Sequence, residues 1–264
     1  MLVDYHIHTT LSGDSEQTID TICQEAEKLG IKELCLTEHV DFEKGNFYYG
    51  RYDFEKVCEN IKYAKEKYPL LTIRHGAEID YQTQYLMEIY DFVAEYDIDF
   101  ILGSIHKIRG VPVAYEGFYE GKTETEAWTE YFQTVREMIC CNMFNCVAHI
   151  DFMKRGTYEY YGKFQPENYK EIICDALKEA IKRDMSLEIN TNGYHWKDMN
   201  DFYPNIDILE WFRDLGGKYI TYGSDSHKIG HLGTKINEMY DLIKSLGYSE
   251  IATYKNKIVK PVKI

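Results

Sequence analysis

The chain alternates short apolar, β-rich runs with longer helical patterns along its whole length, and this alternation constrains the fold more than any other feature. Such a rhythm is typical of βα units around a parallel sheet, and not of a β-sandwich or a helix bundle. The runs that predict strands cover residues 2–6, 33–37, 72–78, 100–105, 146–149, 186–190 and 218–224. We therefore expect an α/β fold with seven strands.

The longer segments between these runs have the apolar spacing of helices. They cover residues 18–29, 54–68, 85–96, 124–141, 166–183, 206–215 and 234–246, and the last precedes a short tail that could add one more strand. No linker rich in proline, glycine or serine separates them, and 264 residues is within the size range of one α/β barrel. We expect residues 1–264 to form a single domain.

The formal net charge of −14 argues against partners that are themselves polyanions. Proteins that bind nucleic acids or anionic membranes displace counterions with a stripe of basic side chains, and none is visible here. A small phosphorylated molecule is still compatible with an acidic protein, because bound divalent cations can invert the local field. We expect a small phosphorylated substrate, no nucleic-acid partner and no membrane partner.

The seven cysteines are odd in number and never spaced as Cys-x-x-Cys, so we expect reduced thiols in the core. The amino terminus lacks a basic region followed by an apolar segment. No apolar run approaches the length of about 18 residues that would suggest a membrane helix. These features predict a soluble, cytoplasmic protein.

Histidines gather where the predicted strands end. If residues 2–6 form a strand, alternation places His6 and His8 on the same side, within reach of one ion. An isolated pair of this kind is more often an ordinary edge strand with two exposed histidines. Here, however, six of the nine histidines fall at the carboxyl end of a predicted strand: His6, His8, His39, His106, His149 and His227. In a parallel barrel all these ends lie on one face, where barrel active sites are built.

Acidic side chains occupy the same strand ends. They are Glu38, Glu78, Asp80, Asp151, Glu188 and Asp225. Together with the histidines they exceed the roughly four to five donors that one zinc-like ion needs. We expect more than one metal ion, with Glu78 as the bridging carboxylate because it is central in strand order and can bind through both oxygens.

The motifs at these strand ends resemble a known family. They are Asp-Tyr-His-Ile-His at 4–8, Leu-Ser-Gly-Asp at 11–14, Thr-Glu-His at 37–39, Gly-Ala-Glu at 76–78, Gly-Ser-Ile-His at 103–106, Ala-His-Ile-Asp at 148–151, Glu-Ile-Asn-Thr at 188–191 and Gly-Ser-Asp-Ser-His at 223–227. In this order, and over nearly the whole chain, they resemble the polymerase and histidinol phosphatase (PHP) superfamily, and more narrowly its monofunctional histidinol-phosphatases. The resemblance implies a distorted (β/α)7 barrel with three divalent transition-metal ions.

The resemblance also implies which residues bind each ion. The first ion is expected at His6, His8, Glu78 and Asp225, the second at Glu78, His106 and His149, and the third at Asp14, His39 and His227. Catalysis is expected to depend on His6, His8, Glu78, His106, His149, Asp225 and His227. Asp14 stands where some relatives place a histidine, and carboxylate ligands shift preference from Zn toward Mn or Fe, so the metal identity stays open.

The resemblance implies hydrolysis of L-histidinol phosphate to L-histidinol and phosphate in histidine biosynthesis, by attack of a metal-bound hydroxide. Two alternatives stay open at this point. The first is a phosphoesterase on the same scaffold that acts on another small phosphomonoester, a nucleotide or phosphotyrosine. The second is a barrel that binds metal for stability alone, but such degeneration normally loses ligands, and every ligand position is filled here.

The predicted substrate contacts are Arg155, Asn192 and Lys197. Arg155 follows the fifth strand, and its planar donors can bind two phosphate oxygens at once, although a solvated loop arginine is the alternative. Some relatives place an arginine directly after the Asn-Thr of the sixth strand, where this chain has Asn192. His195 or Lys197 could replace that arginine.

Other conspicuous residues receive more modest expectations. The aromatic, glycine-containing segment 41–51 is expected to overhang the site, with Asp41 or Glu43 facing the substrate amine. His75, in the middle of a predicted strand, is expected to be a hydrogen-bonded core imidazole and not a ligand. Glu38 is expected to orient His39 or its neighbours, in the way that ligand imidazoles are usually braced.

Overall fold

The structure is a computed structural model that describes residues 1–197 and 199–264. Seven parallel strands form one sheet in the order β1-β2-β3-β4-β7-β8-β9. They are β1 (Leu2–Ile7), β2 (Ile31–Val40), β3 (Thr72–Asp80), β4 (Phe100–Ser104), β7 (Cys146–Val147), β8 (Ser186–Asn190) and β9 (Ile220–Gly223). Every predicted strand is therefore confirmed.

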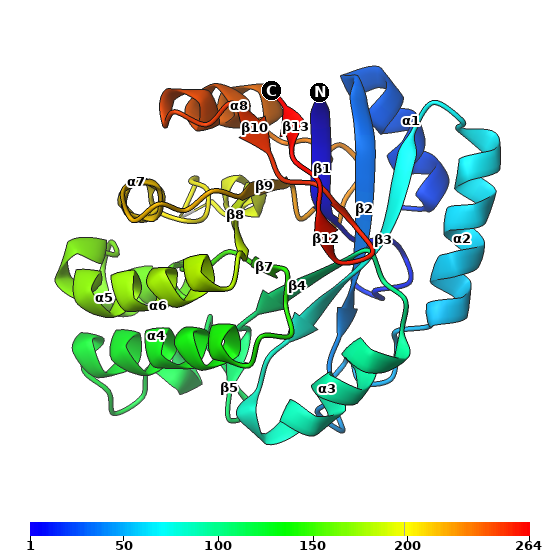
Figure 1. The fold of residues 1–264 in the computed structure, drawn as a ribbon. Helices are drawn as coiled ribbons and strands as arrows, with labels where there is room; N and C mark the ends of the chain where they lie inside the picture. The colour runs from blue at the N-terminus through cyan, green and yellow to red at the C-terminus, as the bar shows by residue number, and fades with distance from the viewer. Residues whose placement is uncertain (198) are drawn as a thin grey trace.

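The sheet nearly closes on itself between its first and last strands (Figure 1). The amide of Asp225, just after β9, donates to the carbonyl of His6 at 2.8 Å, and the amide of His8 donates to the carbonyl of Ser226 at 3.2 Å. Few hydrogen bonds join the first and last strands, and β7 is only two residues long, so the barrel is irregular. These features confirm the predicted distorted (β/α)7 barrel.

Helices surround the barrel (Figure 1). They are α1 (Ile19–Leu29), α2 (Phe54–Lys67), α3 (Leu86–Glu95), α4 (Glu124–Cys140), α5 (Lys154–Tyr161), α6 (Lys170–Lys182), α7 (Ile206–Asp214) and α8 (Ile236–Ser245). Local sequence explains several ends: Thr18 caps the first turn of α1, and Gly30 ends that helix with a φ of 74°. Thr123 and Glu126 form a capping box at the start of α4.

Three details differ from the sequence prediction. Helix α5 was not expected, because Gly156 and several tyrosines give that segment a weak helical pattern. The predicted helix 166–183 begins as a 3-10 turn, Pro166–Tyr169, before α6. The fifth strand ends at Val147 and not at His149, since the φ of 21° at His149 is incompatible with extended backbone.

The tail adds no strand to the barrel. It forms two small antiparallel pairs, β10 (Glu250–Ile251) with β13 (Val262–Lys263) and β11 (Tyr254–Lys255) with β12 (Ile258–Val259). The Tyr254 hydroxyl donates to the Oγ of Ser186 at 3.0 Å, and the Tyr254 amide donates to the Tyr5 hydroxyl at 2.8 Å. Since Ser186 is the first residue of β8, the tail covers the end of the barrel opposite the candidate site.

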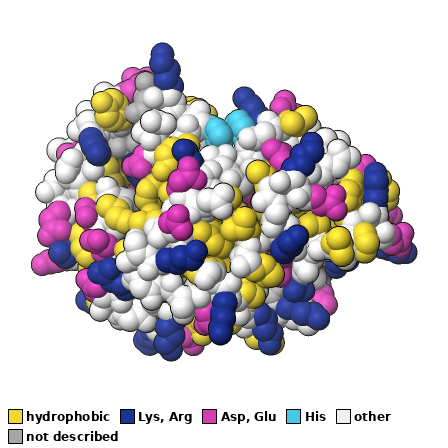
Figure 2. All heavy atoms as spheres, turned by 90° about the horizontal axis from the view of Figure 1, so that it is seen from above, with side chains coloured by type: hydrophobic (Ala, Val, Ile, Leu, Met, Phe, Trp, Pro, Cys, Tyr) yellow, Lys and Arg dark blue, Asp and Glu magenta, His cyan; other side chains and the backbone are white. Residues whose placement is uncertain are grey.

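The surface and the cysteines have the following features. The face drawn in Figure 2 mixes basic and acidic side chains and has no continuous basic stripe. Within residues 1–197 and 199–264, no helix is both long and apolar enough to span a membrane. All seven cysteines are free thiols, as expected, although four of them are only partly buried.

Candidate metal centre

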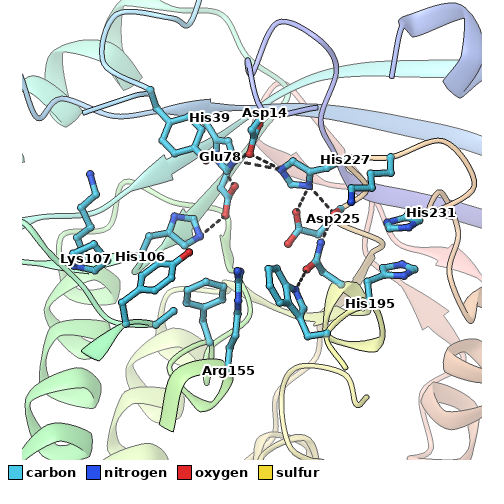
Figure 3. A pocket seen from close by; sticks show the side chains of 18 residues that line it. Asp14, His39, Glu78, His106, Lys107, Arg155, His195, Asp225, His227 and His231 are labelled. Carbon is cyan, nitrogen blue, oxygen red and sulfur yellow. Dashed lines mark hydrogen bonds and ion pairs between the residues drawn. The ribbon is translucent and has the colours of Figure 1, made fainter. Parts of the chain in front are cut away.

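A cavity of about 620 Å³ opens at the carboxyl ends of the strands (Figure 3). Its walls come from the last residues of β2 and β3 and from the segments that follow β1, β2, β4, β7, β8 and β9. The labelled side chains in Figure 3 are Asp14, His39, Glu78, His106, Lys107, Arg155, His195, Asp225, His227 and His231. The predicted strand-end residues therefore lie on one face, as a parallel barrel requires.

The ligand atoms expected for the first ion lie close together. His6 Nε2 is 3.1 Å from His8 Nε2, and the two nitrogens are 3.3 and 3.5 Å from Glu78 Oε2. Asp225 Oδ1 is 3.7 Å from His6 Nε2 and 3.3 Å from His8 Nε2. A tetrahedral shell of ligands at about 2.1 Å from an ion separates its ligand atoms by about 3.4 Å. The four side chains have this spacing.

The second group uses the other oxygen of the same carboxylate. Glu78 Oε1 is 3.5 Å from His106 Nε2 and 3.0 Å from His149 Nε2. Oε2 faces the first group and Oε1 the second, which is the arrangement of a bridging carboxylate. Although burial works to raise it, the surrounding imidazoles of His6, His106 and His39 hold the pKa of Glu78 well below its ordinary range.

The third group lies nearest the mouth of the cavity. Asp14 Oδ2 is 3.4 Å from His39 Nε2 and 3.1 Å from His227 Nε2, and the two nitrogens are 3.5 Å apart. His8, His39 and His227 are also close enough to share an ion. The side chain of His8 thus lies between the first and third groups, with its ring centroid 4.2 Å from those of both His39 and His227.

The donor set fits divalent cations. Glu78 Oε2 is buried, and nitrogens of His6, His8 and His39 surround it at 3.3, 3.5 and 2.9 Å, so a divalent cation shared by these atoms would balance the charge of the carboxylate. Burial lowers the pKa of His8 and of His106 to about 3, so both imidazoles are neutral near pH 7 and offer a lone pair. The combination of imidazole and carboxylate ligands suits Zn, Mn or Fe.

Hydrogen bonds on the outer ring nitrogens orient the ligand histidines. His6 Nδ1 donates to Glu188 Oε1 at 2.6 Å, and Glu188 Oε2 accepts the backbone amide of His149 at 2.8 Å. These bonds leave His6 Nε2 free to face the first group, as is usual for metal ligands. The sequence placed Glu188 at a strand end but assigned it no role.

Two further carboxylates brace the site. His8 Nδ1 donates to Ser12 Oγ at 3.0 Å, and Ser12 Oγ in turn donates to Glu38 Oε2 at 2.5 Å. Glu38 is therefore linked to His39 through Ser12, because Ser12 Oγ also accepts a hydrogen bond from the backbone amide of His39 at 3.2 Å. The expected orienting role of Glu38 is in this sense indirect. Asp80 Oδ1 accepts the backbone amide of His106 at 2.8 Å.

The predicted substrate contacts lie in different surroundings. Arg155 lines the cavity, and its guanidinium carbon lies 3.2 Å above the ring of Trp196. Asn192 also lines the cavity, but its Nδ2 donates to the Asp225 carbonyl at 2.7 Å and its Oδ1 accepts from Trp196 Nε1 at 2.8 Å. Lys197 is exposed and is not among the described residues that line the cavity.

Lys228 is a cavity residue that the sequence did not single out. It follows the ligand His227 directly and lines the cavity, and within the described part of the chain no carboxylate lies within 4.0 Å of its ammonium. Its position next to a ligand motif was the only signal in the sequence. His195 and His231 line the same wall, with their rings stacked at a centroid distance of 3.5 Å.

The segment 41–51 contributes Tyr48 to the cavity wall. Asp41 and Glu43, expected to face a substrate amine, instead bind the ammonium of Lys107, with Nζ to oxygen distances of 3.0 and 2.9 Å. The expectation for these two carboxylates is wrong because it took no account of a lysine from a distant strand. His75 behaves as expected: its Nε2 is hydrogen-bonded to the Tyr52 hydroxyl at 2.8 Å.

The fold and the site together define a class, namely barrel proteins that hold divalent metal between imidazoles and carboxylates at the carboxyl ends of their strands. Comparison with known proteins identifies the family. The family model described as "PHP domain" matches residues 4–192. Histidinol-phosphatase from Lactococcus lactis subsp. lactis (strain IL1403) is 31% identical, and the alignment covers 96% of this chain and 94% of that protein. The chain belongs to the PHP family.

Solved structures give the same result. The crystal structure of histidinol phosphate phosphatase from Lactococcus lactis, complexed with Zn, L-histidinol and phosphate, superimposes with a TM-score of 0.88 at 30% identity, covering 98% of each chain. A structure of the metal-dependent tyrosine phosphatases of Bacillus subtilis and Streptococcus pneumoniae superimposes with a TM-score of 0.53 at 15% identity. The second likeness shows the fold alone.

Proposed function

We propose that this protein hydrolyses L-histidinol phosphate to L-histidinol and phosphate. One observation carries the proposal: three groups of metal ligands, the first two joined at Glu78, each contribute side chains to a cavity of about 620 Å³ that is large enough for a small phosphomonoester. The 30% identical structure from Lactococcus lactis, complexed with Zn, L-histidinol and phosphate, supports this substrate.

We assign three divalent ions to the three ligand groups. His6, His8, Glu78 and Asp225 would hold the first, Glu78, His106 and His149 the second, and Asp14, His39 and His227 the third. Divalent ions of this kind lower the pKa of water to near 7 and neutralise phosphoryl oxygens. Zn, Mn and Fe all suit the donors.

The protein's own groups contribute orientation and charge. Glu78 fixes the spacing of the first two groups because its two oxygens face different histidines. Glu188 keeps the proton of His6 on Nδ1, and Ser12 does the same for His8, so that the Nε2 atoms of both stay available. Phe152 and Trp196 line the wall and reduce the access of bulk water to the reacting phosphate.

Two cations on the cavity wall are suited to bind phosphate. Arg155 and Lys228 both line the cavity, and in the described ranges neither has a carboxylate within ion-pair distance. The cavity's remaining lysine, Lys107, is already neutralised by two carboxylates. We assign the phosphate contacts to Arg155 and Lys228, and Lys197 stays a prediction.

We also propose that residues 1–264 form one domain, because a single cluster of buried apolar side chains extends from Val3 to Tyr254.

We further propose a cytoplasmic location, because free thiols suit a reducing compartment such as the cytoplasm.

Phosphate release from a panel of substrates tests the proposal. The panel contains L-histidinol phosphate, a nucleoside monophosphate, phosphotyrosine and a chromogenic aryl phosphate. We expect kcat/KM for histidinol phosphate to exceed the others by about 100-fold. Asn192, at the position where some relatives have an arginine, favours a second candidate, namely hydrolysis of another small phosphomonoester. A clear preference for any other member of the panel would establish that candidate instead.

Replacing Arg155 with alanine tests the phosphate contact. The change should lower kcat/KM by an amount worth about 1.5 to 3 kcal/mol for every phosphomonoester, because hydrogen bonds to charged groups have this value and the phosphate is common to all substrates. The inhibition constant of inorganic phosphate should rise by a similar factor. Arg183→Ala, which removes an arginine that is ion-paired with Glu179 on α6, is the control. A loss confined to histidinol phosphate would contradict the assignment.

The same assay decides between the two lysines. Lys228→Ala should weaken inhibition by inorganic phosphate, while Lys197→Ala should leave it unchanged, since only Lys228 lines the cavity. The reverse result would assign the contact to Lys197.

A further inference from the structure

Lys107 forms a largely enclosed ion-pair arrangement with two carboxylates at the cavity wall. It lies on β5 (Lys107–Ile108), directly after the ligand His106. Its side chain is 13% exposed, and its ammonium lies between Asp41 and Glu43, whose side chains are 4% and 27% exposed. In Figure 3 the ammonium points away from the metal ligands, so it is not aimed at a bound phosphate. The ammonium of this cavity lysine is thus bound by carboxylates of the protein and does not face the substrate.

We propose that Lys107 is a positioning residue that joins the two aromatic walls of the cavity and so determines which leaving group fits. The proposal rests on the proposed phosphomonoesterase function. It makes Lys107 a determinant of specificity that contacts neither the phosphate nor the metal ions.

On one side, Lys107 holds the segment 41–51. Asp41 receives the ammonium and also accepts hydrogen bonds from the amide of Glu43, at 2.7 Å, and from the side chain of Asn46. The Oδ1 of Asn46 in turn accepts the amide of Tyr48 at 3.3 Å. The ion pair therefore fixes the backbone that presents Tyr48 to the cavity.

Tyr48 connects this wall to the third ligand group. Its hydroxyl donates to Asp14 Oδ2 at 3.1 Å, and its ring centroid lies 4.5 Å from that of His39. A shift of the segment would move an aromatic ring that contacts two side chains of the site. The same ring forms part of the space available to the leaving group.

On the other side, Lys107 belongs to a short hairpin. Strands β5 and β6 (Val111–Pro112) are joined by Arg109 and Gly110, whose φ angles of 52° and 79° are those of a two-residue turn that matches the strand twist. The chain after β6 supplies Pro112, Ala114 and Tyr115 to the cavity. Lys107 therefore links the wall that carries Tyr115 to the wall that carries Tyr48.

The charges explain why one lysine has this effect. Asp41 is nearly buried and lies beside Glu43, so both carboxylates would lose their counter-charge if Lys107 became neutral. Leaving a buried charge unpaired is far more costly than losing a surface ion pair. The segment 41–51 would then move toward water to hydrate the carboxylates and would take Tyr48 with it.

The test compares Lys107→Met, which keeps the apolar stem, with the unmodified enzyme and with Lys107→Arg as a rescue. Lys67→Met is the control, because Lys67 is ion-paired with Asp20 at 2.9 Å in the last turn of α2, outside the cavity. Two readouts are used: kcat/KM for histidinol phosphate and for a small aryl phosphate, and amide hydrogen exchange of the segments 41–51 and 107–115.

We expect Lys107→Met to lower kcat/KM for histidinol phosphate about tenfold more than for the aryl phosphate, mostly through KM, with faster exchange in both segments. Lys107→Arg should restore most of the preference, and Lys67→Met should change neither readout. Unchanged exchange in both segments would overturn the link between the walls. Faster exchange with equal loss on both substrates would overturn the role in specificity.

Failure of the proposed function is recognised separately. If the unmodified enzyme does not prefer histidinol phosphate, the proposed substrate is wrong, whereas the exchange measurement and the substrate that the panel selects still decide the role of Lys107.

Discussion

Glu188→Gln tests whether the bonds behind the ligands control metal binding. Glu188 is 1% exposed and accepts hydrogen bonds at both oxygens, from His6 Nδ1 at 2.6 Å and from the His149 amide at 2.8 Å. Glutamine has one acceptor oxygen, so its amide group must face one of these donors. The backbone of Gly223 packs closely against Glu188, since a Cβ atom at Gly223 would lie 2.3 Å from Glu188 Oε1. The side-chain amide of the glutamine therefore has little room to move away from these donors.

The expected loss is large because two ligand groups share this carboxylate. Removing one bond of this kind behind a metal ligand costs roughly 10- to 100-fold in metal affinity. Burial alone would lower the pKa of His6, but Glu188, Asp225 and Glu78 raise it well above its ordinary value, so the ring responds strongly to its neighbours. We expect the affinity for Zn to fall by about 10- to 100-fold, the scale of one hydrogen bond to a charged group.

Competition with a chromogenic chelator measures the affinity, and thermal unfolding of the metal-free protein measures stability. Glu33→Gln is the control, because Glu33 is a buried glutamate that accepts from Tyr5 and Arg74 at the other end of the barrel, at 2.6 and 2.8 Å. That variant should lose stability but keep its metal affinity. If Glu188→Gln bound Zn within twofold of the unmodified protein, hydrogen bonding by Glu188 would have no role in the site.

Three further outcomes are expected. A strong chelator should abolish phosphatase activity, and readdition of a divalent metal should restore it; full activity in a protein shown by elemental analysis to be metal-free would contradict the metal centre. Glu78→Gln should be the most damaging ligand change, lowering the metal content by more than one ion per chain because its two oxygens face two groups; normal metal content and turnover would exclude the bridge. Asp14→Ala, His39→Ala and His227→Ala should lose one ion each and resemble one another in turnover, and three unrelated phenotypes with unchanged metal content would refute their grouping.

The sequence predicted the ligand cluster because strand geometry is regular. His6 and His8 are two positions apart, so their Nε2 atoms meet at 3.1 Å, and Glu78 and His106 meet because β3 and β4 are parallel neighbours. Such placements follow from period and strand order alone. The resemblance to a known family supplied what periodicity could not, namely which of these side chains share an ion.

Contacts between loops were not predictable in the same way. The pairing of Lys107 with Asp41 joins residues 66 positions apart, through a loop and a hairpin whose path depends on turns such as Arg109 to Gly110. Lys228 enters the cavity and Lys197 does not, although both follow strand-end motifs. The path of such a loop depends on many weak local interactions, and no periodic pattern in the sequence predicts it.

The overall acidic composition also could not predict the electrostatic field inside the cavity. Among the described lining residues the acidic ones are Asp14, Glu78 and Asp225, and all three belong to the ligand groups. Any divalent ion bound there adds two positive charges at the point where these carboxylates converge, beside the free cations Arg155 and Lys228. The net charge of −14 is therefore carried by side chains outside this cavity, and with divalent ions bound an anionic phosphate ester would meet a local field of the opposite sign.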